Sequence, residues 1–470
     1  MRSRFQLVVA TATVFLLIAS SALASALQKT TAPDFNKARD EAVQMLAGFV
    51  KVDTSNPPGN ETKGAEYLKA IFDREGIASE IFELEKGRGN IVARLKGNGK
   101  KRPLLLMGHI DVVGVERDKW TVDPFGGVIK DGFIYGRGAS DDKGMTIACL
   151  EVFLMLHRMK MPLDRDVIFL AEAGEEGTTR VGIDYMVNEH WDKIECEFAL
   201  NEGGGIREVG DKVISVNVAT TEKVPRGMRL IGRGTSGHGS VPRMDNAITH
   251  LAAAVAKVGN WLVPMRLNET TREFFKRLAK ISSPEDAYLF THLEDPKVQE
   301  KLWAKYPQYY SMIRTSIVPT IIKGGFRSNV IPGDAEATLD VRAVPDENIP
   351  ALVESLKKLI DDSTVEVVAP SGRGRPAPAP SGVTTEMFQA LERAQQKMFP
   401  TAVTLPSMLT GATDSAQLRA KGVQAYGLGS VVNDRFPTNV HGNDERLSID
   451  GLGKFVEFIW RAVVDVAGAK

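Results

Sequence analysis

The chain has 470 residues, which predicts two or three domains at roughly 150 residues each, with cores large enough to fold unaided. Hydrophobic residues make up 43% and charged residues 25%, which is typical of a globular protein and excludes a disordered or fibrous one. Lys plus Arg and Asp plus Glu both number 59 and no local basic stripe stands out, so we expect no nucleic-acid partner. The two cysteines, Cys149 and Cys196, are too few for a disulfide framework or a thiolate zinc site. We interpret them as small core residues, with one bridge between them as the alternative.

The first residues have the pattern of a secretory signal peptide. Arg2 and Arg4 precede an apolar run over 7–17, and small residues follow that run. The run is shorter than the roughly 20 apolar residues that span a bilayer, which argues against the alternative of a permanent membrane anchor. We therefore expect a signal peptide over residues 1–24, no stable membrane anchor after its removal, and a periplasmic or secreted protein.

From Phe35 onward, helix and strand patterns alternate along the chain. Apolar residues at helical spacing predict helices over 35–51, 64–75 and 142–159, and short apolar runs predict strands over 90–95, 104–107, 166–171 and 197–201. Such alternation is typical of an α/β fold, in which a mixed sheet carries helices on both faces.

A different pattern begins near Pro225. Its predicted strands lie at 228–232, 317–322, 335–342 and 364–368, and its predicted helices at 245–258 and 348–361. This predicts a second, α+β domain, which we place at 223–370. The charged helical stretch 268–312 is interpreted as an elaboration of that domain.

The first pattern returns near the C-terminus. A stretch rich in Pro, Gly and Arg at 370–382 is interpreted as an exposed linker, and it is followed by a predicted helix over 383–398 and a strand over 426–428. We therefore expect the first domain to be built from 33–222 and 371–470, with the second domain inserted into it.

Candidate metal ligands follow the ends of predicted strands. His109 comes directly after the strand over 104–107, and Asp111 has the same strand-face parity two residues on. Ligand crevices form at this edge of open α/β sheets. Asp141 stands at the start of a predicted helix, after a glycine-rich turn, where a helix cap is the alternative interpretation.

Further acidic groups follow the next strands. Glu175 and Glu176 are adjacent, and Glu202 comes after another strand end. Neighbouring unpaired carboxylates repel, so a site here must hold cations or raise a pKa, unless the turn is simply solvated. His441 adds a second imidazole in a C-terminal loop. Imidazole and carboxylate together match the ligands of two divalent ions, with one carboxylate as the bridge and one left as a base.

With these residues in view, the sequence resembles a family of peptidases with a co-catalytic pair of zinc ions. This family contains aminoacylases, glutamate carboxypeptidases, yeast-type carboxypeptidase S and succinyl-diaminopimelate desuccinylase. The resemblance extends from about residue 53 to 447 and is carried by segments 53–59, 109–111, 136–144, 175–176, 202, 237–242, 328–332, 340–342, 413–414 and 441.

The resemblance implies the roles of the residues at the strand ends. It implies two Zn²⁺ ions, replaceable by Co²⁺ or Mn²⁺, with His109 and Glu202 on one ion, Glu176 and His441 on the other, and Asp141 as the bridge. Glu175 is implied as the general base and Asp111 as the residue that orients the His109 ring. A cis peptide bond between Asp141 and Asp142 is also implied.

The resemblance also gives roles to residues outside the ligand set. It implies a lid or dimerisation function for the inserted domain, in which His238 donates to the developing oxyanion, often from a partner subunit. Arg342 and Asn329 are implied to bind a substrate carboxylate, which suits the planar guanidinium fork. Gly411 and Thr413 are implied to line the same pocket.

These observations predict an exported zinc hydrolase that cleaves an amide bond beside a free carboxylate, as a carboxypeptidase or dipeptidase. An N-acyl amino-acid amidohydrolase is the alternative, because both reactions share an electrophile, a water and a carboxylate anchor. A metallophosphoesterase would use more Asp and Asn ligands, and a non-catalytic binding protein would not need Glu175. The expected partners are a small peptide or N-acyl amino-acid substrate and a second copy of the chain, bound through the inserted domain.

Overall fold

The computed structural model describes residues 32–370 and 374–469. The predicted signal peptide at 1–24 lies outside these ranges and stays a prediction. Within them, no helix is both long and apolar enough to cross a membrane. Cys149 and Cys196 are both free and buried, which confirms their interpretation as core residues.

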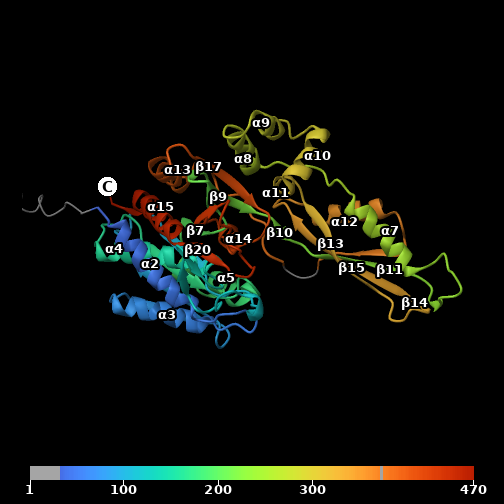
Figure 1. The fold of residues 1–470 in the computed structure, drawn as a ribbon, viewed down its shortest axis with the longest axis horizontal. Helices are drawn as coiled ribbons and strands as arrows, with labels where there is room; N and C mark the ends of the chain where they lie inside the picture. Colours follow the sequence, from blue (N-terminus) through green and yellow to red (C-terminus); the bar gives the residue numbers. More distant parts are fainter. Residues whose placement is uncertain (1–31, 371–373, 470) are drawn as a thin grey trace, which may run out of the picture.

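A large mixed sheet of ten strands forms the centre of the first domain in the described part of the chain (Figure 1). Parallel pairs join β3 to β6 and β7, while β1, β2 and β6 pair antiparallel. In spatial order the strands are β1 (Ser79–Glu83), β2 (Gly89–Leu95), β6 (Val167–Glu172), β3 (Leu104–His109), β7 (Phe198–Glu202), β18 (Gln424–Leu428), β9 (Lys212–Glu222), β8 (Gly205–Val209) and β19 (Val431–Asn433), with β17 (Val403–Leu409) beside β9.

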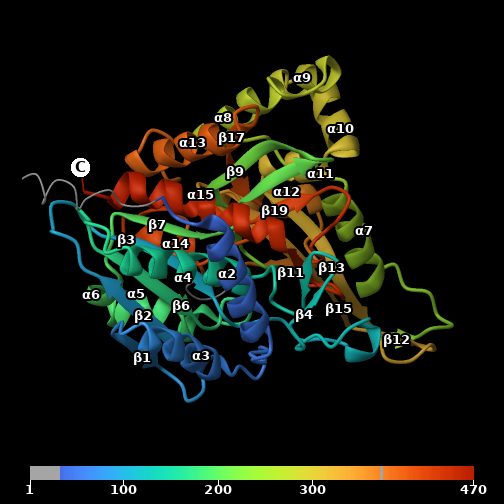
Figure 2. The same ribbon diagram turned by 60° about the vertical axis from the view of Figure 1, so that its left-hand side comes forward.

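Helices cover both faces of this sheet, which confirms the predicted α/β class (Figure 2). One face packs against α2 (Phe35–Val50), α3 (Glu61–Arg74), α4 (Lys143–Arg158), α13 (Glu386–Met398) and α15 (Ile449–Ala467). The other face packs against α5 (Ile183–Glu189), α6 (Trp191–Ile194) and α14 (Ser415–Ala420). Along β3, Leu104 and Leu106 enter the first core and Leu105 and Met107 the second. A strand buried on both faces must be apolar throughout, which explains the unbroken apolar run before His109.

A smaller sheet forms the second domain and has its own core. Its strands are β10 (Val224–Pro225), β15 (Asp334–Ala343), β11 (Met228–Arg233) and β16 (Val365–Val368), with β13 (Ser316–Gly324) beside β15. Helices α7 (Ala247–Gly259) and α12 (Ile349–Ile360) bury Leu251 and Leu356 against Leu230 and Leu339. A short pair, β12 (Gly237–His238) and β14 (Val330–Ile331), lies at the end of this domain that is farthest from the large sheet (Figure 1).

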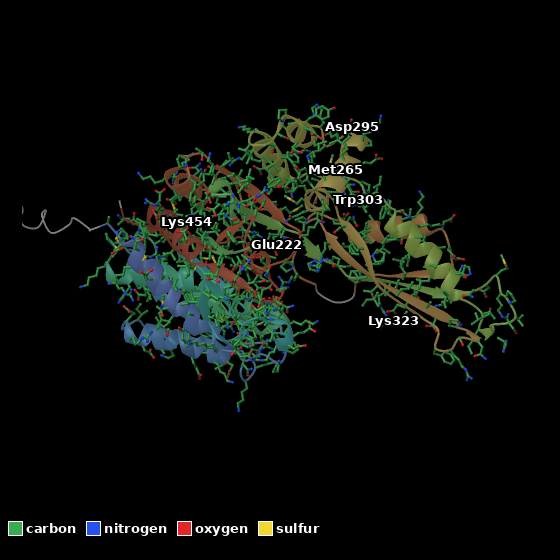
Figure 3. The ribbon with its side chains drawn as sticks, in the orientation of Figure 1. Glu222, Met265, Asp295, Trp303, Lys323 and Lys454 are labelled. Carbon is green, nitrogen blue, oxygen red and sulfur yellow. The ribbon has the colours of Figure 1, made fainter. Side chains whose placement is uncertain are left out.

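The stretch 268–312 folds into four helices that pack on the first domain. These are α8 (Glu269–Ala279), α9 (Pro284–Thr291), α10 (Pro296–Lys305) and α11 (Pro307–Met312), and Figure 3 labels Asp295 and Trp303 among them. Asn268 and Thr271 form a capping box that starts α8, whose Phe274 packs in one core with Leu405 and Met408 of β17. An edge strand of the large sheet thus covers the apolar face of α8, while the same core also includes Val344 of the second domain, and the interpretation of the stretch as an elaboration of that domain stays a prediction.

A three-stranded sheet brings the C-terminal loop next to the start of α4. It consists of β20 (Arg446–Ser448), β5 (Phe133–Tyr135) and β4 (Val128–Lys130). The pairing of β20 with β5 fixes two loops that are more than 300 residues apart in sequence, one leading to Asp141 and one carrying His441.

Candidate metal centre

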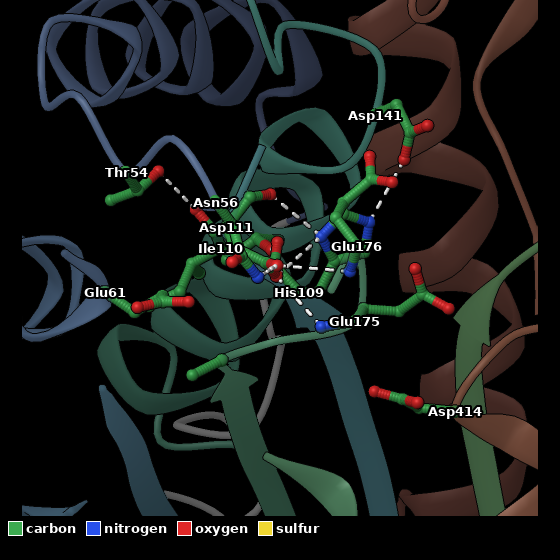
Figure 4. A network of polar contacts seen from close by, with 12 residues as sticks. Thr54, Asn56, Glu61, His109, Ile110, Asp111, Asp141, Glu175, Glu176 and Asp414 are labelled. Carbon is green, nitrogen blue, oxygen red and sulfur yellow. Dashed lines mark hydrogen bonds and ion pairs between the residues drawn. The ribbon is translucent and has the colours of Figure 1, made fainter. Parts of the chain in front are cut away.

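His109 is the last residue of β3 and is held by Asp111. Its Nδ1 lies 3.0 Å from the Asp111 backbone oxygen and 3.4 Å from Asp111 Oδ1. Its Nε2 lies 3.0 Å from Asp141 Oδ1 (Figure 4). A carboxylate on one ring nitrogen is the arrangement that orients a metal-binding imidazole and strengthens its basicity.

Asp141 lies between two imidazoles. Its Oδ1 faces His109 Nε2 at 3.0 Å, and its Oδ2 faces His441 Nε2 at 3.1 Å. The peptide bond between Asp141 and Asp142 is cis, which confirms that prediction. A carboxylate that bridges two ions must direct its two oxygens to different ligand sets, as Asp141 does.

A buried glutamate, Glu445, holds the turn that carries Asp141. Its Oε1 accepts hydrogen bonds from the backbone N–H groups of Ser140 (2.9 Å) and Asp141 (3.1 Å). Its Oε2 accepts from the Gly138 N–H at 3.1 Å and from Arg137 Nη1 at 2.6 Å. Because Glu445 belongs to the same loop as His441, one carboxylate fixes two candidate ligands relative to each other.

The two adjacent glutamates lie in the turn after β6. The backbone N–H groups of Glu175 and Glu176 donate to Asp111 Oδ1 and Oδ2, each at 3.1 Å. Glu176 Oε1 lies 2.8 Å from His441 Nε2. Asp111 therefore positions both His109 and the glutamate turn, which explains why it is fully buried.

Two groups of side chains could each hold a metal ion in the described part of the chain. Within a group, the ligand atoms lie within 4.8 Å of one another, and the groups are His109 with Asp141 and Glu176, and His109 with Glu175 and Glu202. The five predicted ligands thus share one edge of the sheet, with Glu202 next to His109 and Glu176 next to His441. Two imidazoles and three carboxylates fit a divalent cation such as Zn²⁺.

The pKa values of the side chains in this cluster are shifted in a way that fits the binding of cations. Burial raises the pKa of Glu176 to about 7 and raises the pKa of Glu202. A hydrogen bond to Asp141 raises the pKa of His441 to about 9. Burial alone would lower the pKa of His109, but its bonds to Asp111 and Asp141 raise it well above the usual value. Without metal, these groups must hold protons that bound cations would displace.

Arg375 contacts the predicted base and was not expected in the site. Its Nη2 donates to Glu175 Oε1 at 2.9 Å, and its Nη1 lies 3.7 Å from Asp414 Oδ1. Asp414 is fully buried, and burial raises its pKa to about 8. The interpretation of 370–382 as an exposed linker is therefore wrong for Arg375, which points inward while its backbone oxygen accepts a hydrogen bond from Arg226 Nη2 at 2.8 Å.

The other predicted residues do not join this cluster. His238 is exposed at the far end of the second domain, where its Nδ1 lies 2.7 Å from Ser240 Oγ. Asn329 is beside it, because the Asn329 backbone oxygen accepts from the Gly239 N–H at 2.8 Å. Arg342 Nε, on β15, donates to Asp340 Oδ1 at 2.8 Å. Their roles toward substrate stay predictions.

The loop after β17 contains Gly411, which is exposed, and Thr413, which is buried. The Thr413 N–H and Oγ1 donate to the two carboxylate oxygens of Glu222 at 2.9 and 2.8 Å. Glu222 also pairs with Arg419 at 2.9 Å. In this conformation the Thr413 hydroxyl supports the loop, and its role toward substrate stays a prediction, as does that of Gly411.

An imidazole and carboxylate cluster at the carboxyl edge of an α/β sheet, with a glutamate beside it, is the site of a metal-dependent hydrolase. The chain belongs to peptidase family M20/M25/M40, whose model matches residues 105–465. This confirms the resemblance drawn from the sequence motifs. The protein is thus a hydrolase of a metallopeptidase and amidohydrolase family.

Individual relatives agree with this membership. A probable carboxypeptidase S-like protein 2 of Dictyostelium discoideum is 32% identical over 375 residues, 77% of this chain and 71% of the relative. The N-fatty-acyl-amino acid synthase/hydrolase PM20D1 of Homo sapiens is 28% identical over 446 residues, 90% of this chain and 88% of the relative. The crystal structure of an M20 family metallo-carboxypeptidase from Sulfolobus solfataricus has a TM-score of 0.68 at 22% identity, over 90% of this chain and 98% of that one. It has the same fold.

Proposed function

We propose that the protein is a hydrolase with two zinc ions that cleaves an amide bond beside a free carboxylate, as a carboxypeptidase or dipeptidase. The observation that carries this proposal is the position of Asp141, whose two oxygens face His109 and His441. Glu175 is next to this arrangement and is held by Arg375 at 2.9 Å. The donor set suits Zn²⁺, and Co²⁺ or Mn²⁺ would be accepted by the same ligands.

The side chains divide the work of amide hydrolysis. Zinc bound at this edge would polarise the scissile carbonyl and make a water acidic at neutral pH. Glu175 takes a proton from the attacking water and delivers it to the leaving nitrogen. Arg375 donates to Oε1 of Glu175, which restricts the orientation of the carboxylate and leaves Oε2 as the oxygen that would take the proton. Asp111 fixes the backbone of the same turn.

A second candidate is an N-acyl amino-acid amidohydrolase. The full-length similarity to a human N-fatty-acyl-amino acid synthase/hydrolase, 28% over 90% of this chain, favours it. The two candidates share the zinc ions, the base and the carboxylate anchor, and they differ in the group on the carbonyl side of the scissile bond. Substrates that differ only in that group therefore separate them.

A substrate screen tests the proposal. Purified protein is reconstituted with Zn²⁺, Co²⁺ or Mn²⁺ and assayed with dipeptides, N-acyl amino acids, their C-terminal amides and a phosphoester, beside a chelated control. We expect metal-dependent release of a free amino acid from substrates with a free carboxylate and little from the amides. Equal cleavage of amides and free acids would contradict the exopeptidase assignment, and phosphoester cleavage without amide cleavage would favour the phosphoesterase.

We also propose that the inserted domain completes the site by closing over it or through a second copy of the chain. Val318, Ile321 and Ile322 are exposed on β13, an edge strand of the smaller sheet. Exposed apolar residues on a sheet edge favour pairing with another chain. Sedimentation of the wild type, and of a variant with Ile321→Lys, tests this: a dimer that the variant loses is the expected result.

Export is a further proposal, which rests on the basic and apolar pattern of residues 1–24. Expression of the full chain in a bacterium, followed by fractionation and N-terminal sequencing, tests it. A mature protein in the periplasm or medium that begins near residue 25 is expected. An uncut chain in the membrane fraction would favour the anchor instead.

A further inference from the structure

A cavity of about 550 Å³ lies between the four-helix stretch and the large sheet. Helices α8 and α11 form one side, and β8, β9 and β17 form the other. Its apolar and aromatic walls are Phe274, Tyr306, Tyr309, Met312, Met408 and Leu409. Cavities that hold small organic ligands have volumes of roughly 300 to 1,000 Å³ and mostly apolar walls.

This cavity adjoins the metal centre. Gly203 and Gly204 directly follow the candidate ligand Glu202, and both glycines line the cavity. The same two glycines line a smaller cavity of about 220 Å³ that Asp141 and Glu202 also line. Gly203 has a φ of +113°, and a Cβ on it would lie 2.5 Å from Leu409 Cδ1. Only a glycine therefore allows the wall of the cavity to come this close to a ligand residue.

The cavity also has polar lining groups, which are Arg207, Asn217, Lys305, Gln308 and Ser407. Lys305 pairs with Asp286 at 2.6 Å and lies over the Tyr306 ring at 5.3 Å. Burial raises the pKa of the Tyr309 hydroxyl, and the charge of Arg207 lowers it in part, so these two groups lie near each other. Beside the polar groups, the aromatic and methionine walls provide the apolar surface that a ligand would contact. Methionine and aromatic side chains adapt to apolar groups of varied shape.

We propose that this cavity is a subsite for an apolar group on the carbonyl side of the scissile bond, either an acyl chain or a large apolar side chain. The inference rests on the proposed function, which assigns the carboxylate end of the substrate to Arg342 and Asn329 of the inserted domain. The acyl chain or side chain, on the other side of the scissile bond from the carboxylate, would then extend from the metal ions past Gly203. The helices α8–α11 would thereby set substrate preference.

Two substrate series with alanine at the carboxylate end test the subsite. One contains N-acetyl-, N-hexanoyl- and N-decanoyl-alanine, and the other contains Gly-Ala, Leu-Ala and Phe-Ala. We expect kcat/KM of the zinc-loaded wild type to rise at least tenfold from the smallest to the largest group of a series, since each buried methylene favours binding severalfold. The series with the steeper rise identifies the occupant as an acyl chain or a side chain.

Three variants locate the effect in the cavity. Ser407→Phe fills it from β17, and Tyr309→Ala removes one aromatic wall. Both should lower kcat/KM at least tenfold for the largest group and less than threefold for N-acetyl-alanine and Gly-Ala. Tyr288→Ala is the control, because Tyr288 lies on α9, is 52% exposed and does not line the cavity. The subsite would be overturned if kcat/KM of the wild type did not depend on the size of the group. It would also be overturned if the folded variants lost kcat/KM equally for all substrates of a series.

A binding measurement separates this inference from the proposed function. Calorimetry with acetate, hexanoate and decanoate on zinc-loaded protein needs no turnover. If neither series is hydrolysed, the proposed function fails, yet tighter binding of the longer acids to the wild type, lost in Ser407→Phe, would still support the cavity as an apolar site. Affinities that do not depend on chain length would overturn it.

Discussion

The carboxyl edge of the large sheet and the tip of the inserted domain differ in how completely their side chains are assembled. At the sheet edge, Asp111 and Glu445 each accept several hydrogen bonds and hold the candidate ligands in place. At the tip, His238 is exposed, and its ring Nδ1 lies 2.7 Å from the Oγ of a near neighbour, Ser240. The sheet edge is organised before substrate arrives, whereas the proposed role of His238 requires the tip to move or to come from a second subunit.

This difference suits the two regions to different functions, metal binding at the sheet edge and closure over substrate at the tip. Rigid supporting contacts are what a metal centre requires, because ligand atoms must keep their distances. A lid that closes over substrate needs the opposite, since it has to open again for release. Changes at the sheet edge should therefore affect the metal ions or the chemical step, whereas changes at the tip should affect turnover and leave the metal ions bound.

The largest effect should come from the predicted base. Glu175→Gln should lower kcat by a factor of about 100 to 10,000, the usual contribution of a positioned base, while both metal ions stay bound. Steady-state kinetics and metal analysis of the same sample measure the two quantities. Loss of metal from this variant would mean that Glu175 is a ligand and that Glu176 is the base.

Next in size is the contribution of the tip. His238→Ala should lower kcat about 100-fold, the effect of removing one oxyanion donor, with normal metal content. If a second subunit supplies His238, mixing inactive His238→Ala with inactive Glu175→Gln under conditions of subunit exchange should restore activity. Exchange without any recovery would instead leave a monomer that closes on itself.

Arg375 should matter through the orientation of Glu175. Arg375→Gln should lower kcat by about ten- to 100-fold and change KM little, because a displaced base reacts less often. The conservative Arg375→Lys should keep part of the activity, and added guanidinium should partly rescue Arg375→Ala. A purely structural role would give a lower melting temperature and no rescue.

Within the inserted domain, Arg342 should affect substrate binding, unlike His238, which should affect turnover. Arg342→Lys should raise KM about tenfold for substrates with a free carboxylate, because a point charge replaces a bidentate fork. The rise should be absent for any amidated substrate that is cleaved slowly. Equal changes for both kinds of substrate would remove Arg342 from carboxylate binding.

A final effect concerns the dependence of metal affinity on pH. Without metal, Glu176 has a pKa of about 7 and His441 of about 9, so both hold protons at pH 6. Metal must displace these protons, and zinc affinity should therefore rise with pH by about tenfold per unit for each proton still bound, which means two protons below pH 7 and the His441 proton alone between pH 7 and 8. Chelator competition at several pH values measures this. An affinity that is constant over that range would contradict the assignment of these groups as ligands.

The sheet edge could be predicted from the sequence because its residues follow directly from buried strands. His109 ends the apolar run of β3, and Glu202 is the last residue of β7, so the ends of two parallel strands locate both side chains. The alternation of helices and strands likewise predicted the α/β sheet. A residue at the end of a predicted strand can therefore be placed in the fold as well as identified by its chemistry.

Other features had no such signal. Arg375 stands in a Pro- and Gly-rich stretch without periodicity, and only the fold shows that its side chain turns toward Glu175. The helical pattern of 268–312 was recognisable, but its partner, β17, lies about 100 residues later in the chain. Spacing reveals that a helix has an apolar face and does not reveal which surface covers that face.

The metal content of zinc-reconstituted protein, measured by elemental analysis for the wild type and for Asp141→Asn, tests the paired metal centre most directly. We expect two zinc ions per chain in the wild type and at most one in the variant, because the bridging carboxylate has lost its charge. A wild-type content near zero, or two ions retained in Asp141→Asn, would contradict a paired metal centre at this edge of the sheet.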